Sequence, residues 1–72
     1  MIEWRPKVGD LVRFNNWFAK MGLAQYYNAR EGDFGVVIEL DIDDPMKGSC
    51  RVYSSRTMHT DWLHYSYLDR VM

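Results

Sequence analysis

The stretch of the chain that decides its fold is Lys7-Val8-Gly9-Asp10-Leu11-Val12-Arg13-Phe14, together with its counterpart Gly35-Val36-Val37-Ile38-Glu39-Leu40. Each is a short apolar run with the alternation of a strand, and each is entered through a glycine turn. This pattern is typical of a strand that opens or continues a small curled sheet.

The length and composition restrict the chain to one small domain. Seventy-two residues make at most a single domain, residues 1–72, and so short a chain buries only roughly 60% of its unfolded surface. Cys50 is the single cysteine, so an internal disulfide is not available. Three Trp, three Phe and five Tyr must therefore supply much of the buried area.

The same composition bears on location and on partners. One cysteine suits a reducing compartment, the N-terminus lacks the apolar segment of a signal peptide, and no stretch approaches the ~18 apolar residues of a membrane span. We therefore expect a cytoplasmic protein without a membrane span. Nine Lys and Arg against ten Asp and Glu give a formal net charge of -1, whereas general nucleic-acid binders usually carry a basic surplus.

Period-two patterning and turn residues place five short strands along the chain. The predicted strands are 11–14, 34–41, 49–54, 57–62 and 68–71, with a 3₁₀ turn at 63–67. In the first strand Val12 and Phe14 should point inward, because Arg13 cannot be buried without a partner.

The later strands divide in the same way into two faces. The alternation puts Val36, Ile38 and Leu40 on one face of the second strand. It likewise puts Met58, Thr60 and Trp62 on one face of the fourth.

The connection over residues 15–33 interrupts this pattern. Asn15 or Asn16 can N-cap a short helix, and Trp17, Met21 and Ala24 then fall on one side of it. A connection longer than about 12–15 residues in a compact domain is usually functional or mobile.

Together these elements predict an all-β, five-stranded small barrel with a long, partly helical first loop and a 3₁₀ turn before the last strand. Closing the sheet would remove most of its exposed edges. The alternative is a three-stranded sheet with a helix over residues 16–28 packed against it.

The chain resembles SH3-like barrels in the order and spacing of its motifs. The opening Lys7-Val8-Gly9-Asp10-Leu11-Val12-Arg13 looks like the first strand of these barrels, and Gly35-Val36-Val37-Ile38-Glu39 resembles the second. The later strands are matched by Arg51-Val52-Tyr53, Thr60-Asp61-Trp62 and Leu68-Asp69-Arg70-Val71. The likeness covers nearly the whole chain except 15–33, and among these barrels it is nearest to small proteins of tailed bacteriophages. That resemblance implies a phage-encoded component of a larger assembly such as a virion, located in the host cytoplasm or the virion.

Two further resemblances imply other partners. The chain is similar to a small peripheral barrel protein of photosystem I, which has a comparable length and an enlarged first loop, and this implies a peripheral component of a redox complex. The barrels of KOW type in ribosomal and transcription proteins share the glycines of the first two strands, which implies nucleic-acid binding.

The residue types that carry chemistry do not form a catalytic or metal-binding set. His59 and His64 have only Asp61 near them in sequence, whereas a metal site needs three or four convergent ligands. Cys50 has no nearby base and is expected to pack with Val52. The run Asp41-Ile42-Asp43-Asp44 lacks the glycine and glutamate of an EF-hand loop and is interpreted as a polar hairpin tip. We therefore expect no enzyme, no cofactor and no metal.

The aromatic residues are the strongest candidates for a binding site. The candidates for contact with a partner are Trp17, Phe18, Tyr26, Tyr27, Tyr53, Trp62 and Tyr65. In an SH3-like barrel the first loop lies beside the third strand and the 3₁₀ turn, so these rings would line one groove, and Tyr and Trp are enriched at interfaces. The alternative is that a core of this size simply needs them.

The basic residues support a second hypothesis. Lys20, Arg30, Lys47, Arg51 and Arg56 could form a phosphate-binding face, as in single-strand binders, or an ordinary solvated surface. The preferred hypothesis is a non-enzymatic protein-interaction or structural module that binds another protein, or a second copy, through residues 15–33. A nucleic-acid-binding barrel is the first alternative, and a peripheral component of a redox complex is the second.

Overall fold

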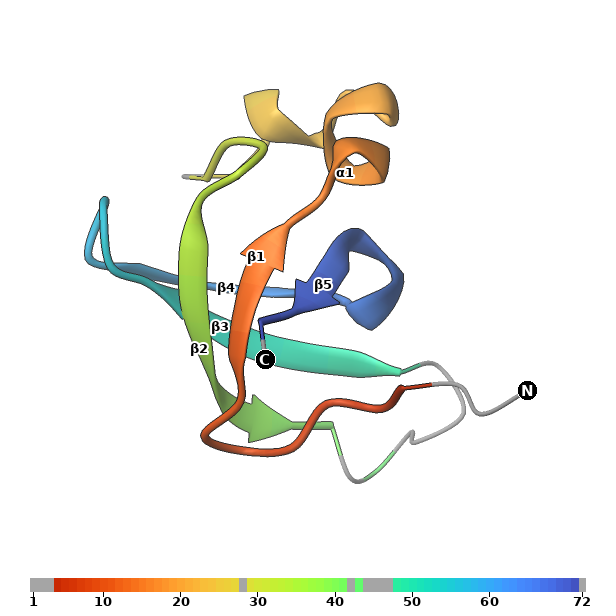
Figure 1. Cartoon of the computed structure of the whole chain (residues 1–72), viewed down its shortest axis with the longest axis vertical. Helices are drawn as coiled ribbons and strands as arrows, with labels where there is room; N and C mark the ends of the chain where they lie inside the picture. The colour runs from red at the N-terminus through yellow and green to blue at the C-terminus, as the bar shows by residue number, and fades with distance from the viewer. Residues whose placement is uncertain (1–3, 28, 42, 44–47, 72) are drawn as a thin grey trace.

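Five antiparallel strands form one sheet in the computed structural model, which describes residues 4–27, 29–41, 43 and 48–71. The strands are β1 (Leu11–Phe14), β2 (Phe34–Leu40), β3 (Ser49–Ser54), β4 (His59–His64) and β5 (Leu68–Arg70). Their order in the sheet is β4-β3-β2-β1-β5 (Figure 1). The all-β prediction is confirmed. Among the described residues no ladder joins β4 to β5, so the sheet is open at these two strands.

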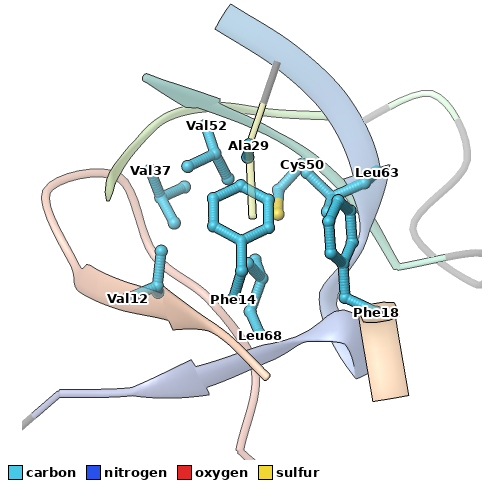
Figure 2. Packing of buried hydrophobic residues seen from close by; sticks show 9 residues of the cluster. All are labelled: Val12, Phe14, Phe18, Ala29, Val37, Cys50, Val52, Leu63 and Leu68. Carbon is cyan, nitrogen blue, oxygen red and sulfur yellow. The ribbon is translucent and has the colours of Figure 1, made fainter. Parts of the chain in front are cut away.

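The core lies on one face of this sheet. Its buried apolar members are Val12, Phe14, Phe18, Ala29, Val37, Cys50, Val52, Leu63 and Leu68 (Figure 2). Val12 and Phe14 are both fully buried, which confirms the inward face predicted for the first strand. Burial of these side chains is the main stabilising contribution to so short a chain.

A β-bulge in β2 changes which of its side chains reach the core. Val37 lies opposite Val52, but the next pair along is Glu39 with Arg51, so Ile38 is an extra residue in the ladder. A bulge of this kind reverses the alternation beyond it. Val36 and Ile38 are exposed, whereas Leu40 is half-buried against the core. The prediction that Leu40 shares their face was therefore wrong.

The fourth strand is shifted relative to its predicted position. A turn over residues 55–58 is closed by the Met58 amide, which donates to the Ser54 carbonyl at 2.8 Å, so β4 begins at His59 instead of residue 57. Leu63 then lies opposite Cys50 and is buried, while Trp62 stays 44% exposed. The 3₁₀ helix η3 (Tyr65–Tyr67) is present, but Leu63 and His64 belong to the strand before it.

The long connection contains two short helices. Asn15 caps helix α1 (Asn16–Lys20), as predicted, because its side-chain oxygen accepts from the Phe18 amide at 3.1 Å. Gly22, with φ of 71°, then leads into the 3₁₀ helix η1 (Leu23–Gln25). The alternative of a helix over 16–28 is not what forms. The expected stripe of Trp17, Met21 and Ala24 is exposed instead, since Phe18 is the buried residue of α1.

Replacing Gly35 tests the close approach of β2 and β3. A Cβ at this position would lie 2.5 Å from Val52 Cγ1 and 2.7 Å from the Tyr53 carbonyl oxygen, which is backbone and cannot rotate away. We expect Gly35→Ala to lower the free energy of unfolding by about 2–3 kcal/mol, the usual cost of overpacking. The exposed neighbour Val36 provides the control, because Val36→Ala should cost less than about 1 kcal/mol. Equal midpoints in a urea titration of the two variants would contradict this packing.

Candidate functional site

An open groove lined by apolar side chains and carboxylates lies beside the end of β2, where the bulge turns Ile38 outward. It is lined by Val8, Ile38, Glu39, Leu40, Asp41, Asp43 and Trp62 and has a volume of about 660 Å³. We call these seven residues the acidic groove.

Backbone hydrogen bonds bring the segment before β1 to this groove. The Gly9 amide donates to the Val37 carbonyl at 2.7 Å, and the Val37 amide donates to the Asp10 carbonyl at 3.0 Å. These bonds hold the segment that contains Val8 against β2, next to the bulge that turns Ile38 outward. On the other side, the register of β4 places Trp62 opposite Arg51 on the outer face.

Hydrogen bonds and one ion pair order the polar side of the acidic groove. Glu39 Oε1 lies 3.3 Å from Arg51 Nη1, and the Arg51 guanidinium also donates to Thr60 Oγ1 at 3.1 Å. Asp41 Oδ1 accepts from the Asp43 amide at 3.2 Å, which holds these two carboxylates at the start of the β2–β3 connection. The described residues that line the groove include three carboxylates and no cation.

A second apolar surface covers the helical connection. Trp17, Lys20 and Met21 are spaced i, i+3 and i+4, so they share one face of α1 and the turn that follows. Trp17 and Met21 are about half exposed, and Tyr26, just after η1, is 76% exposed. We call Trp17, Lys20, Met21 and Tyr26 the α1 patch.

The structure does not bring the residues of the predicted aromatic site together in one place. Phe18 is fully buried and packs edge-to-face on Phe14 with centroids 4.9 Å apart, so it belongs to the core and cannot contact a partner. Tyr65 is also buried. Tyr27 lies 5.7 Å from Phe18 and is half-buried. Phe18 and Tyr27 therefore meet as interior packing, and Tyr65 packs separately on Trp4 and His64, so these rings do not line the open groove that was expected.

The remaining predicted residues are more accessible. Trp17 and Tyr26 belong to the α1 patch, while Trp62 lines the acidic groove. Tyr53 is half-buried on the outer face, where it lies opposite Val36 and Thr60.

Sequence reasoning missed most of the acidic groove. Val8, Ile38 and the carboxylates of Asp41 and Asp43 were not predicted as site residues, although one signal was available. The run Val36-Val37-Ile38 is apolar on both faces, and a core on one side of the sheet must leave part of it exposed.

Two of the candidate phosphate-binding cations are already paired. Arg51 binds Glu39, and Arg56 Nε lies 2.9 Å from Asp33 Oδ2. Lys20 belongs to the α1 patch, Arg30 follows buried Ala29, and Lys47 lies outside the described residues.

Both histidine side chains form hydrogen bonds with nearby backbone groups. His59 Nδ1 lies 2.7 Å from the Thr57 carbonyl oxygen, so it donates there. His64 Nδ1 accepts from the Ser66 amide at 3.1 Å and caps η3, and its ring stacks on Tyr65. Within the part of the chain that the structure describes, there is no group of three or more His, Cys, Asp or Glu that could hold a metal ion.

The Cys50 thiol is held in its neutral form. Burial in the core raises its pKa from 9.0 to about 11, because a thiolate would be deprived of water there. A thiol of this kind is inert as a nucleophile at neutral pH.

Comparisons of the chain with models of protein families, with curated proteins and with solved structures found no match. None of the helices in the described residues has the length and apolar character needed to cross a membrane.

Asn15 should be the residue that positions the α1 patch. Besides capping α1, its Nδ2 donates to the Ser66 carbonyl at 3.0 Å and to Asp69 Oδ1 at 3.3 Å, which ties the helix to η3 and β5. We expect Asn15→Ala to lower the free energy of unfolding by about 1–2 kcal/mol. The rate of amide hydrogen exchange in α1 should also be higher in Asn15→Ala than in wild type. The neighbouring Asn16 is exposed and is the control, since Asn16→Ala should leave both measurements nearly unchanged.

The raised pKa of Cys50 makes stability fall at alkaline pH. The folded protein keeps the thiol proton up to about pH 11, whereas the unfolded chain releases it near pH 9. The free energy of unfolding is therefore unaffected below pH 9 and decreases as pH rises to 11, by roughly 3 kcal/mol in total. Urea titrations of wild type and Cys50→Ala from pH 7 to 11 measure this. The free energy of unfolding of Cys50→Ala should fall less between pH 9 and 11 than that of wild type. Equal decreases in the two proteins would contradict a raised pKa of Cys50.

Proposed function

We propose that the chain is a non-enzymatic protein-interaction module that works as part of a larger assembly. The observation that carries the proposal is the amount of apolar surface left on the outside of so small a domain. Among the described residues the exposed large hydrophobic side chains are Val8, Leu11, Trp17, Met21, Tyr26, Phe34, Val36, Ile38, Met58 and Trp62.

These side chains are grouped, not scattered. Trp17, Met21 and Tyr26 make up most of the α1 patch, and a second set lies along the outer face of the sheet. On that face Leu11 lies opposite Val36, and Val36 lies opposite Tyr53 on the other side. Cross-strand neighbours of this kind form a continuous apolar surface, and such surfaces mark sites where another protein binds.

The pairing of the basic side chains favours protein binding over nucleic-acid binding. Arg51 and Arg56, two of the candidate phosphate-binding residues, are paired with carboxylates. A phosphate would have to compete with Glu39 and Asp33 for them. The polar groups that could support catalysis, His59 and His64, are likewise engaged in local bonds, and this supports a binding role.

We propose further that the fold is an SH3-like small barrel and that the protein is encoded by a phage. The open sheet order β4-β3-β2-β1-β5, with a long first connection and a 3₁₀ helix before β5, is compatible with an SH3-like small barrel. The motif resemblance to small proteins of tailed bacteriophages supports a phage-encoded protein built into an assembly such as a virion.

The size of the protein in its native cell tests the function. We expect the chain, at natural abundance, to elute from gel filtration of a gentle lysate well above its monomer mass of 8.6 kDa. Trp17→Ser combined with Tyr26→Ser should move it toward that mass, because both rings are exposed and their loss removes apolar contact area.

Met58→Asn provides the control for this experiment. Met58 is 75% exposed, lies in the β3–β4 turn outside both surfaces, and has φ of 59°, which Asn tolerates. Its replacement should leave the elution volume unchanged. Elution of the wild type as a monomer in the lysate would overturn the proposed function.

A further inference from the structure

Resting on the proposed function, we infer that the partner of the α1 patch is the acidic groove of a second copy of this chain. The copies then associate head to tail, with the helical end of one seated on the outer sheet face of the next. Complementary charge, complementary polarity and the placement of the two surfaces in the molecule each support this arrangement.

The two surfaces carry charges of opposite sign, Lys20 in the α1 patch and Asp41 and Asp43 in the acidic groove, where Glu39 is already paired with Arg51. Around the α1 patch, residues 15–27 contain Lys20 and no Asp or Glu. The α1 patch of one copy is therefore attracted to the acidic groove of another copy, whereas two α1 patches or two acidic grooves repel each other.

The apolar parts of the two surfaces match as well. Trp17 and Met21 flank Lys20 on one side of α1, and the acidic groove has an apolar floor of Val8, Ile38 and Trp62 next to its carboxylates. Seating α1 there places Trp17 and Met21 on the floor and the Lys20 ammonium near Asp41 and Asp43. Apolar anchors surrounded by paired charges are the common composition of a protein interface.

The two surfaces lie at opposite ends of the domain. Figure 1 shows α1 and the residues that follow it at one end of the long axis, and the end of β2 with the segment before β1 at the other. When the α1 patch of one copy binds the acidic groove of a second copy, the dimer still has one free α1 patch and one free acidic groove. Further copies can therefore add, which yields a ring or a filament.

Two monomeric variants that complement each other test the arrangement. In the patch variant, Trp17→Ser and Lys20→Glu disable the α1 patch and leave the groove intact. In the groove variant, Asp41→Lys and Asp43→Lys disable the acidic groove and leave the patch intact. All four side chains are exposed or half-buried, so both variants should keep the wild-type circular dichroism spectrum. The urea midpoint of the groove variant should fall only slightly, because it loses the hydrogen bond from the Asp43 amide to Asp41.

Sedimentation equilibrium of the purified proteins provides the measurement. The wild type should associate, with a mass that rises with concentration and falls as salt screens the charges. Each variant alone should be monomeric, and an equimolar mixture should form a 1:1 heterodimer that grows no further, since only one intact patch and one intact groove remain. Lys20→Glu alone should weaken wild-type association by about tenfold or more. The control Arg70→Glu makes the same charge change on exposed β5 and should not.

Four results would overturn the inference. Self-association of the patch variant would place the contact between two grooves, and self-association of the groove variant would place it between two α1 patches. A mixture that stays monomeric would exclude a patch-to-groove contact. A purified wild type that is monomeric, while the same chain is part of a large species in its native lysate, would leave the proposed function standing with a foreign partner.

Discussion

The edge-to-face contact between Phe14 and Phe18 determines how the rest of the chain is arranged. Phe14 ends β1 and Phe18 lies four residues later, so their contact at 4.9 Å turns the connection back over the core as soon as the strand ends. Asn15, between them, caps α1 and bonds to Ser66 and Asp69. A helix of five residues buries only one side, and because Phe18 occupies it, Trp17 must face outward.

A core on one side of the sheet creates the second surface. β2 is apolar at Val36, Val37 and Ile38, but only Val37 reaches the interior. The bulge then returns Leu40 to the core side and leaves Ile38 outside, beside the segment that Gly9 holds against β2. The acidic groove is therefore a consequence of the same packing that stabilises the fold, since the side chains that the core cannot accept gather on the opposite face.

Local signals were sufficient for part of this structure. A helix cap at Asn15 or Asn16 and the burial of Val12 and Phe14 were predicted from neighbouring residues alone, and the structure has Asn15 as the cap and both side chains buried. The position of Ile38 was not predictable in this way, because a bulge depends on how β2 pairs with β3. The same holds for Leu63, whose burial follows from the turn that delays β4. The aromatic residues were treated as one candidate set, because which of them are buried depends on the same long-range pairing.

The sequence shows which residues are charged, but where these residues lie on the surface depends on the topology of the fold. A formal net charge of -1 argues against a general affinity for phosphates, and it is silent about attraction between copies. That attraction depends on where charges of each sign lie. Figure 1 shows the chain entering α1 from β1 at one end of the domain and leaving β2 at the other. Lys20 is the last residue of α1, and Asp41 directly follows β2. The inferred contact therefore pairs these charges between copies, because they belong to different ends of the same molecule.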